Sequence, residues 1–110
     1  VSNNDSVNLC GQTDLIGMSA LIKKADLLIT NSTGPLHLAI ALDCKVIGLY
    51  PPKKDCLPIR WGPYGHPDWA LMPDLPICNV CKPGKISPCR CLEEITPVSV
   101  YDKSVEMLRI

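Results

Sequence analysis

The chain lacks the charge excess and the long apolar runs that mark several large classes of protein. Its 11 lysines and arginines balance 11 aspartates and glutamates, so the formal net charge is zero. Nucleic-acid binding depends on clustered cationic side chains that neutralise phosphates, and we therefore expect no nucleic-acid partner. No apolar stretch is long enough to span a membrane, and no secretory signal pattern opens the chain.

Two common nucleotide-binding motifs are also missing. The sequence contains neither a glycine-rich dinucleotide fingerprint nor a Walker loop, so a nicotinamide-dependent or ATP-hydrolysing function has no support. The 110 residues, 46% of them hydrophobic, fit one small domain or part of a larger one. The chain begins at Val1 rather than Met, and a strand candidate follows almost at once. We therefore interpret it as a piece of a longer protein.

The first half of the chain alternates strand and helix patterns. Strands are predicted at residues 6–9, 27–30 and 46–50, and helices at residues 15–25 and 35–42. Short connections between such elements are typical of a parallel sheet with flanking helices, and the run 27–30 suits a strand buried on both faces. Asp14 is a suitable N-cap for the first helix. The apolar face of that helix, which we expect to pack on the sheet, consists of Leu15, Met18, Leu21, Ile22 and Ala25.

The most informative segment joins the second predicted strand to the second predicted helix. This turn–helix junction comprises residues 31–37. Ser32 and Thr33 are N-cap residue types, Pro35 suits the first helical turn, and Gly34 lets a ligand approach the backbone closely. A helix N-terminus in this place directs unpaired N–H groups and a partial positive charge towards a ligand such as a diphosphate.

His37 lies near the end of the first turn of the same helix and can direct a ring nitrogen towards that ligand. The helix is otherwise apolar nearly all round, so we expect it to be buried. The alternative is that the junction merely caps a buried helix and that His37 is a paired core histidine. Ligands of parallel sheets bind beyond the carboxyl ends of the strands, where residues 11–13, 31–34 and 50–54 are expected. Lys53, Lys54 and Arg60 follow in a loop that is either near an anionic ligand or simply solvated.

The second half of the chain is dominated by proline. Nine of the eleven prolines fall between Pro51 and Pro88, which predicts a mostly irregular region over residues 51–95. Trp61 and Tyr64 are expected to anchor this region by burying their rings. A last helix is predicted over residues 96–110, with Thr96 as its cap and an apolar face that includes Val98, Tyr101, Val105 and Leu108.

Cysteine is unusually frequent, and its seven residues fall into two groups. Cys10 and Cys44 have apolar neighbours and are predicted to be small buried core residues, while Cys56 resembles a loop thiol. The odd total is against a fully disulfide-bonded secreted framework. Four thiols within fourteen positions could hold a structural zinc, with disulfides and reduced, unliganded thiols as the alternatives. This cysteine cluster consists of Cys78, Cys81, Cys89 and Cys91.

Five segments together resemble the C-terminal half of the bacterial ADP-heptose:lipopolysaccharide heptosyltransferases, glycosyltransferase family 9. They are Asn8–Leu15, Ala25–Ile29, Asn31–Ala39, Val46–Tyr50 and Arg60–Gly65. The resemblance covers most of the chain. It implies an α/β fold with a Rossmann-like parallel sheet and flanking helices, the C-terminal, donor-binding half of a GT-B glycosyltransferase. Residues 1–50 would form the core, 51–95 a Pro/Cys-rich irregular loop, and 96–110 the final helix.

The resemblance also implies a function. The protein would transfer heptose from ADP-heptose to the lipopolysaccharide core, with the diphosphate on the N–H groups near Thr33 and Gly34 and the nucleoside near Gln12 and Thr13. The other donor-binding residues implied are Asn31, Ser32, Pro35 and His37. In this family the general base comes from the N-terminal half, so no catalytic residue is expected within this chain. No cofactor is required, and a structural zinc is one of the alternatives given above for the cysteine cluster.

Several alternatives and expectations accompany this hypothesis. Many family members carry aspartate where this chain has Ser32, which can form hydrogen bonds but supplies no carboxylate, so the donor sugar stays open. A GT-B transferase with another nucleotide sugar is one alternative, and a non-catalytic, zinc-stabilised nucleotide-binding or interaction module is the other. The expected partners are a nucleotide diphosphate sugar and, through the missing half, a lipopolysaccharide core or lipid A acceptor. We expect the protein in the cytoplasm, either free or peripheral at the inner membrane.

Overall fold

The computed structural model describes residues 6–52, 57–74 and 91–108 of the chain. Its elements, in chain order, are α1 (Leu15–Lys24), β1 (Leu28–Asn31), α2 (Gly34–Ala41), β2 (Val46–Leu49), α3 (Pro58–Trp61), a 3-10 turn η2 (Pro67–Trp69), β3 (Ala70–Leu71), a second 3-10 turn η3 (Cys91–Glu94) and α4 (Pro97–Leu108).

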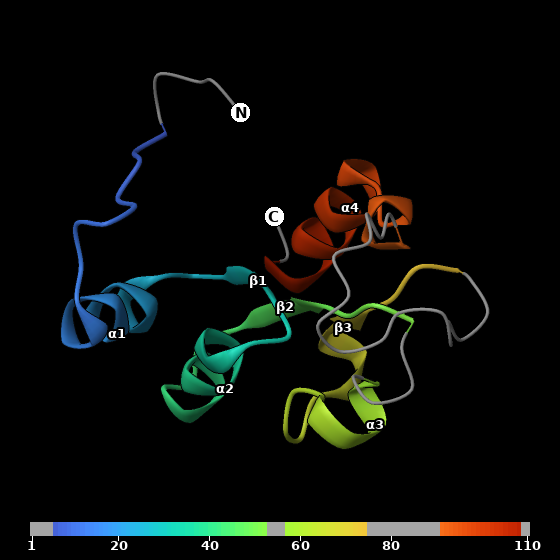
Figure 1. Cartoon of the computed structure of the whole chain (residues 1–110), viewed down its shortest axis with the longest axis horizontal. Coiled ribbons are helices and arrows are strands. Elements are labelled where there is room, and N and C mark those ends of the chain that lie inside the picture. Colours follow the sequence, from blue (N-terminus) through green and yellow to red (C-terminus); the bar gives the residue numbers. More distant parts are fainter. Residues whose placement is uncertain (1–5, 53–56, 75–90, 109–110) are drawn as a thin grey trace, which may run out of the picture.

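The three strands form one parallel sheet in the order β1-β2-β3. Asn31 at the end of β1 pairs with Leu49 at the end of β2, so both strands finish at the same edge. Helices α2 and α4 lie on opposite faces of this sheet (Figure 1). The predicted α/β class, with a parallel sheet and flanking helices, is confirmed.

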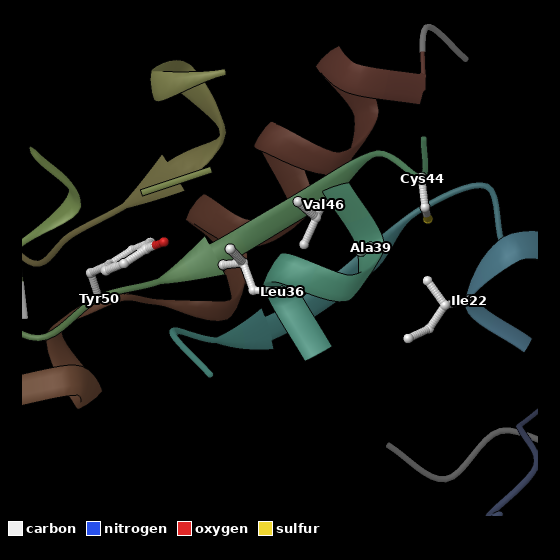
Figure 2. Packing of buried hydrophobic residues seen from close by; sticks show 6 residues of the cluster. All are labelled: Ile22, Leu36, Ala39, Cys44, Val46 and Tyr50. Carbon is white, nitrogen blue, oxygen red and sulfur yellow. The ribbon is translucent and has the colours of Figure 1, made fainter. Parts of the chain in front are cut away.

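The core is built around the central strand β2. Val46 and Ile47 are both fully buried, which requires cover on both faces of the strand. Val46 belongs to the cluster under α2, where Leu36 and Ala39 are fully buried (Figure 2). Tyr50, just beyond the end of β2, is the largest fully buried side chain. The strand that carries the core is therefore β2 and not the run 27–30, for which burial on both faces is predicted.

Two strand predictions are wrong in detail. Residues 6–9 form no strand and are exposed; in Figure 1 they run away from the sheet beyond α1. As a result, β1 is an edge strand of the described sheet, and its residues alternate between half-buried and exposed instead of being buried on both faces. Ile29 is 47% exposed because nothing described here covers that face of the edge strand. An apolar run alone does not distinguish a central strand from an edge strand.

Helix α1 begins where the sequence predicts, because the Asp14 carboxylate accepts a hydrogen bond from the Gly17 N–H at 2.7 Å. Its predicted apolar face is only partly covered. Ile22 is buried and Met18 packs against the core, but Leu15 and Leu21 are 69% and 45% exposed. The helix contacts α2, and the sheet does not cover all five residues as we expected.

Helix α2 begins one residue before the predicted start, and it is not buried all round. Leu36 and Ala39 face the core and are fully buried. Gly34, His37 and Ala41 are exposed, and their spacing of three and four residues places them on one face of the helix. An apolar helix can therefore leave one stripe open when the neighbouring layer covers only the other side.

Helix α4 is capped by Thr96 as predicted, since its hydroxyl oxygen accepts a hydrogen bond from the Ser99 N–H at 3.1 Å. Its orientation differs from the prediction: Val98 and Tyr101 are each 67% exposed. The end of the helix is fixed to the sheet by Lys45, whose ammonium donates to the Met107 carbonyl at 2.8 Å. This bond places a cation at the negative end of the helix dipole.

The proline-rich region contains more regular structure than predicted, namely α3, η2 and β3. Tyr64 is 87% exposed and Trp61 is 47% exposed, so the prediction that both residues anchor the region by burying their rings is wrong. The region is held instead by the Trp61 carbonyl, which accepts a hydrogen bond from the buried Tyr50 hydroxyl at 2.8 Å. His66 and Trp69 stack with ring centroids 3.7 Å apart.

The two cysteines expected in the core differ. Cys44 is buried as predicted, with its thiol directed at the carbonyls of Ala25 and Lys45. Cys10 is exposed, because the strand expected to carry it inward does not form. Cys56 and, in the cysteine cluster, Cys78, Cys81 and Cys89 lie outside the described residues, as do Lys53 and Lys54, while Cys91 is described only as the first residue of η3. Over the described ranges, no helix combines the length and the apolar character needed to cross a bilayer.

Candidate functional site

The turn–helix junction folds back on the end of β1. The Thr33 N–H donates to the Asn31 carbonyl at 2.8 Å, and the Thr33 hydroxyl donates to the same carbonyl at 3.4 Å. Thr33 is the N-cap residue of α2, with extended backbone, as the sequence predicts for this position. Its hydroxyl is used on Asn31, however, and makes no capping bond to the helix.

The start of α2 therefore differs from the starts of α1 and α4. In those helices a side-chain oxygen, from Asp14 or from Thr96, accepts a first-turn N–H. In α2, the Leu36 N–H bonds to the Thr33 carbonyl at 3.1 Å, and Pro35 has no N–H. The N–H of Gly34 stands at the first helical position, where a helix offers no acceptor of its own. The start of α2 thus retains a backbone donor for an external acceptor.

The junction is also open to a ligand. Asn31, Thr33, Gly34 and His37 are exposed, and a Cβ built on Gly34 meets no atom within 4 Å. His37 lies on the same exposed face of α2 as Gly34. The alternative of a buried, paired core histidine is therefore not the arrangement that this chain adopts. Ser32 and Pro35, the other two residues of the predicted site here, are half-buried.

The junction is supported from behind by β2. A Cβ on Gly48 would overlap Leu36 Cδ1 and would lie 2.8 Å from Tyr50 Cε1, so only glycine allows these two side chains to meet over the strand. Leu36 belongs to the first turn of α2, and Tyr50 follows the end of β2 (Figure 2). Burial raises the pKa of the Tyr50 hydroxyl above its ordinary value, which keeps it protonated as a donor to the Trp61 carbonyl.

Gln12 and Thr13 lie apart from the junction in this structure. Gln12 ends a turn in which Gly11 has a φ of 74° and the Gln12 N–H bonds to the Leu9 carbonyl at 3.0 Å, and Thr13 follows this turn. Both are exposed, and in Figure 1 their segment lies beyond α1, away from the start of α2. The two halves of the predicted donor site are therefore not brought together, because the first predicted strand is not formed.

Concave surfaces occur at the opposite edge of the sheet, near the amino ends of the strands. One, of about 480 Å³, is lined by Asp26, Cys44, Lys45 and Leu108 among others. Burial raises the pKa of the Cys44 thiol there, with a smaller contribution from the negative charge of Asp26. Within residues 6–52, 57–74 and 91–108, no three His, Cys, Asp or Glu side chains converge on a metal site. The start of α2 lies at the other edge of the sheet, away from these concave surfaces.

Sequence reasoning missed the support for the junction. The sequence places Tyr50 at the ligand-binding edge but indicates no contact between Tyr50, Gly48 and α2. A glycine inside a strand nevertheless signals a place where another group approaches the backbone closely. That signal could have indicated the contact with α2. The Tyr50 to Trp61 hydrogen bond joins residues eleven positions apart, and no sequence pattern indicates it.

The family model of glycosyltransferase family 9 (heptosyltransferase) matches residues 1–81. Among curated proteins, the chain is 39% identical over 61 residues to the lipopolysaccharide core heptosyltransferase OpsX of Haemophilus influenzae, covering 56% of this chain and 17% of that protein. It is 26% identical over 106 residues to lipooligosaccharide heptosyltransferase 2 of Campylobacter jejuni, covering 93% of this chain and 32% of that protein. A putative glycosyltransferase of Haemophilus influenzae is 41% identical over 54 residues, 49% of this chain and 16% of that protein.

The chain thus spans less than a third of the length of these curated relatives. No solved structure matches it. The family match extends over the junction, over β2 with Gly48 and Tyr50, and over α3, and it covers well over half of the chain. The chain belongs to glycosyltransferase family 9, the heptosyltransferase family.

Proposed function

We propose that this chain is the donor-binding part of a transferase that moves heptose from ADP-heptose to the lipopolysaccharide core. The observation that carries the proposal is the turn–helix junction: a helix start without a side-chain cap, with an open Gly34 and an exposed His37 on one face. The names of two relatives, heptosyltransferases of lipopolysaccharide and lipooligosaccharide, support the sugar and the acceptor.

The junction suits the diphosphate of such a donor for electrostatic reasons. The Gly34 N–H and the positive end of the α2 dipole favour phosphate oxygens. Glycosyl transfer leaves negative charge on the departing nucleotide diphosphate, so these groups would stabilise the charge that develops in the transition state. His37, one turn into the helix, would hydrogen-bond a phosphate or the sugar.

The proposal assigns the other half of the chemistry to residues beyond this chain. The general base that deprotonates the acceptor hydroxyl and the lipopolysaccharide core or lipid A acceptor site would be supplied by the N-terminal half. The nucleoside would lie near Gln12 and Thr13, which would have to approach the junction when the donor binds. We expect no cofactor requirement and a protein in the cytoplasm or peripheral at the inner membrane. For the cysteine cluster, a structural zinc, disulfides and reduced thiols are the three alternatives.

A second donor is favoured by one observation. Ser32, half-buried within the junction, supplies a hydroxyl and no carboxylate, so a nucleotide sugar other than ADP-heptose is the alternative donor.

The test is a transfer assay on the full-length protein that contains this chain. ADP-heptose and a UDP-sugar are offered in parallel with a heptose-deficient lipopolysaccharide acceptor, and the product is identified by mass. We expect heptose transfer from ADP-heptose and none from the isolated 110-residue chain. If transfer occurs only from the UDP-sugar, the donor is a UDP-sugar and not ADP-heptose. Transfer by the isolated chain, or no binding of any nucleotide sugar by the full-length protein, would contradict the proposal.

A further inference from the structure

Tyr50 connects two segments that are far apart in sequence and meet at the carboxyl edge of the sheet. Its hydroxyl donates to the carbonyl of Trp61, the last residue of α3, at 2.8 Å. Its ring lies over Gly48, opposite the Leu36 side chain from the first turn of α2. Because the ring is fully buried and the hydroxyl is satisfied, the position of Tyr50 is fixed by both partners.

The backbone of Trp61 takes part in the turn of α3. The Trp61 N–H bonds to the Leu57 carbonyl at 3.2 Å, and the Gly62 N–H bonds to the Pro58 carbonyl at 2.7 Å, which closes the single turn of α3. A four-residue helix has too few internal bonds to fix its own place on the domain. The long-range bond from Tyr50 supplies a fixed point for it.

The position of this segment relative to the junction follows from the sheet register. Asn31 pairs with Leu49, so the residues that follow them, Ser32 and Tyr50, leave neighbouring strands at the same edge. Tyr50 bonds the last residue of α3 and meets Leu36 of α2 over Gly48, so a ligand on the start of α2 would have α3 on the same side of this edge. The indole of Trp61 is 47% exposed and is carried by that segment.

We propose that Tyr50 is a positioning residue for donor binding: it holds α3 at the edge of the turn–helix junction and supports the first turn of α2 through Leu36. This inference rests on the proposed function, since it assigns the ligand of the junction to a nucleotide diphosphate sugar. Tyr50 itself contacts no ligand, because its side chain is completely enclosed.

The experiment compares two tyrosine variants of the full-length protein. Tyr50→Phe keeps the ring over Gly48 and removes the hydroxyl that bonds Trp61. Tyr101→Phe is the matched control, because Tyr101 is 67% exposed on α4. Amide hydrogen exchange of residues 57–65 is measured without ligand, and KM for donor, KM for acceptor and kcat are measured separately.

We expect Tyr50→Phe to speed exchange at Trp61 and Gly62 and to raise donor KM about 3- to 10-fold, the range that loss of one hydrogen bond covers. Acceptor KM and kcat should remain as in the wild type, and Tyr101→Phe should change nothing. An unchanged donor KM would overturn the inference, even if stability or kcat falls. The reason is that a merely structural role lowers the fraction of active protein and does not change KM. If the wild-type protein itself binds no nucleotide sugar, the proposed function fails; wild-type binding with an unaffected Tyr50→Phe variant overturns the positioning role alone.

Discussion

The contact over Gly48 allows a prediction with a magnitude. In Gly48→Ala, the new Cβ would overlap Leu36 Cδ1 and would lie 2.8 Å from Tyr50 Cε1 and 3.4 Å from Tyr50 Cζ. Both neighbours are fully buried, so neither can move away into solvent. Overpacking of this kind costs about 1–3 kcal/mol. Alanine also restricts the unfolded chain, which returns about 0.4–1 kcal/mol. We expect a net loss of about 1–2 kcal/mol in the free energy of unfolding.

The matched control is Gly34→Ala, the same chemical change at a glycine whose Cβ would meet nothing within 4 Å. Urea unfolding of the full-length protein should show a lower midpoint for Gly48→Ala and no loss for Gly34→Ala. In a donor titration, Gly34→Ala should lose more affinity than Gly48→Ala, because its new methyl group stands on the exposed face where the diphosphate would bind. Equal stability of the two variants would refute the packing argument. Undiminished donor affinity of Gly34→Ala would refute close approach of the ligand at that glycine.

Three further predictions concern single side chains. Because His37 is exposed, His37→Ala should weaken donor binding in a calorimetric titration while the unfolding midpoint stays unchanged, and lost stability with unchanged affinity would remove His37 from the site. Burial raises the pKa of the Cys44 thiol, so peptide-resolved alkylation at pH 8 should modify Cys10 well before Cys44, and equal alkylation rates would contradict the burial. Above the ordinary thiol pKa of 9.0, the unfolded chain loses a proton that the folded state retains, so the contribution of Cys44 to stability should decline as the pH rises. Lys45→Met keeps the side-chain length but removes the donor to Met107, which should cost about 0.3–1 kcal/mol and speed amide exchange in the last turn of α4, whereas unchanged exchange would show that the bond does not hold the helix.

The sequence predicted those parts of the fold that depend on local chemistry. Cap residue types at Asp14, Thr33 and Thr96 located three helix starts to within one residue, and the apolar run 46–50 located β2 as a strand. Such signals lie within a few residues of the element they define, so one sequence suffices to read them.

The remaining errors concern neighbours that local patterns do not specify. The exposure of Ile29, Leu15 and Tyr101 depends on which layer covers each element. The same apolar pattern suits a fully or a partly covered face. The short strand β3 has two residues and no periodicity to detect. In the candidate site, the residue types of the junction were predictable. The bond from the Thr33 hydroxyl to the Asn31 carbonyl, which leaves α2 without a side-chain cap, could not be inferred from the sequence.

The most direct test of the central claim is amide hydrogen exchange of the full-length protein with and without saturating ADP-heptose. If the start of α2 binds the diphosphate, residues 31–38 should exchange more slowly with the ligand present, above all at the N–H of Gly34. Residues 43–46, at the opposite edge of the sheet, should be unaffected. Protection at residues 43–46 with none at 31–38 would contradict the account.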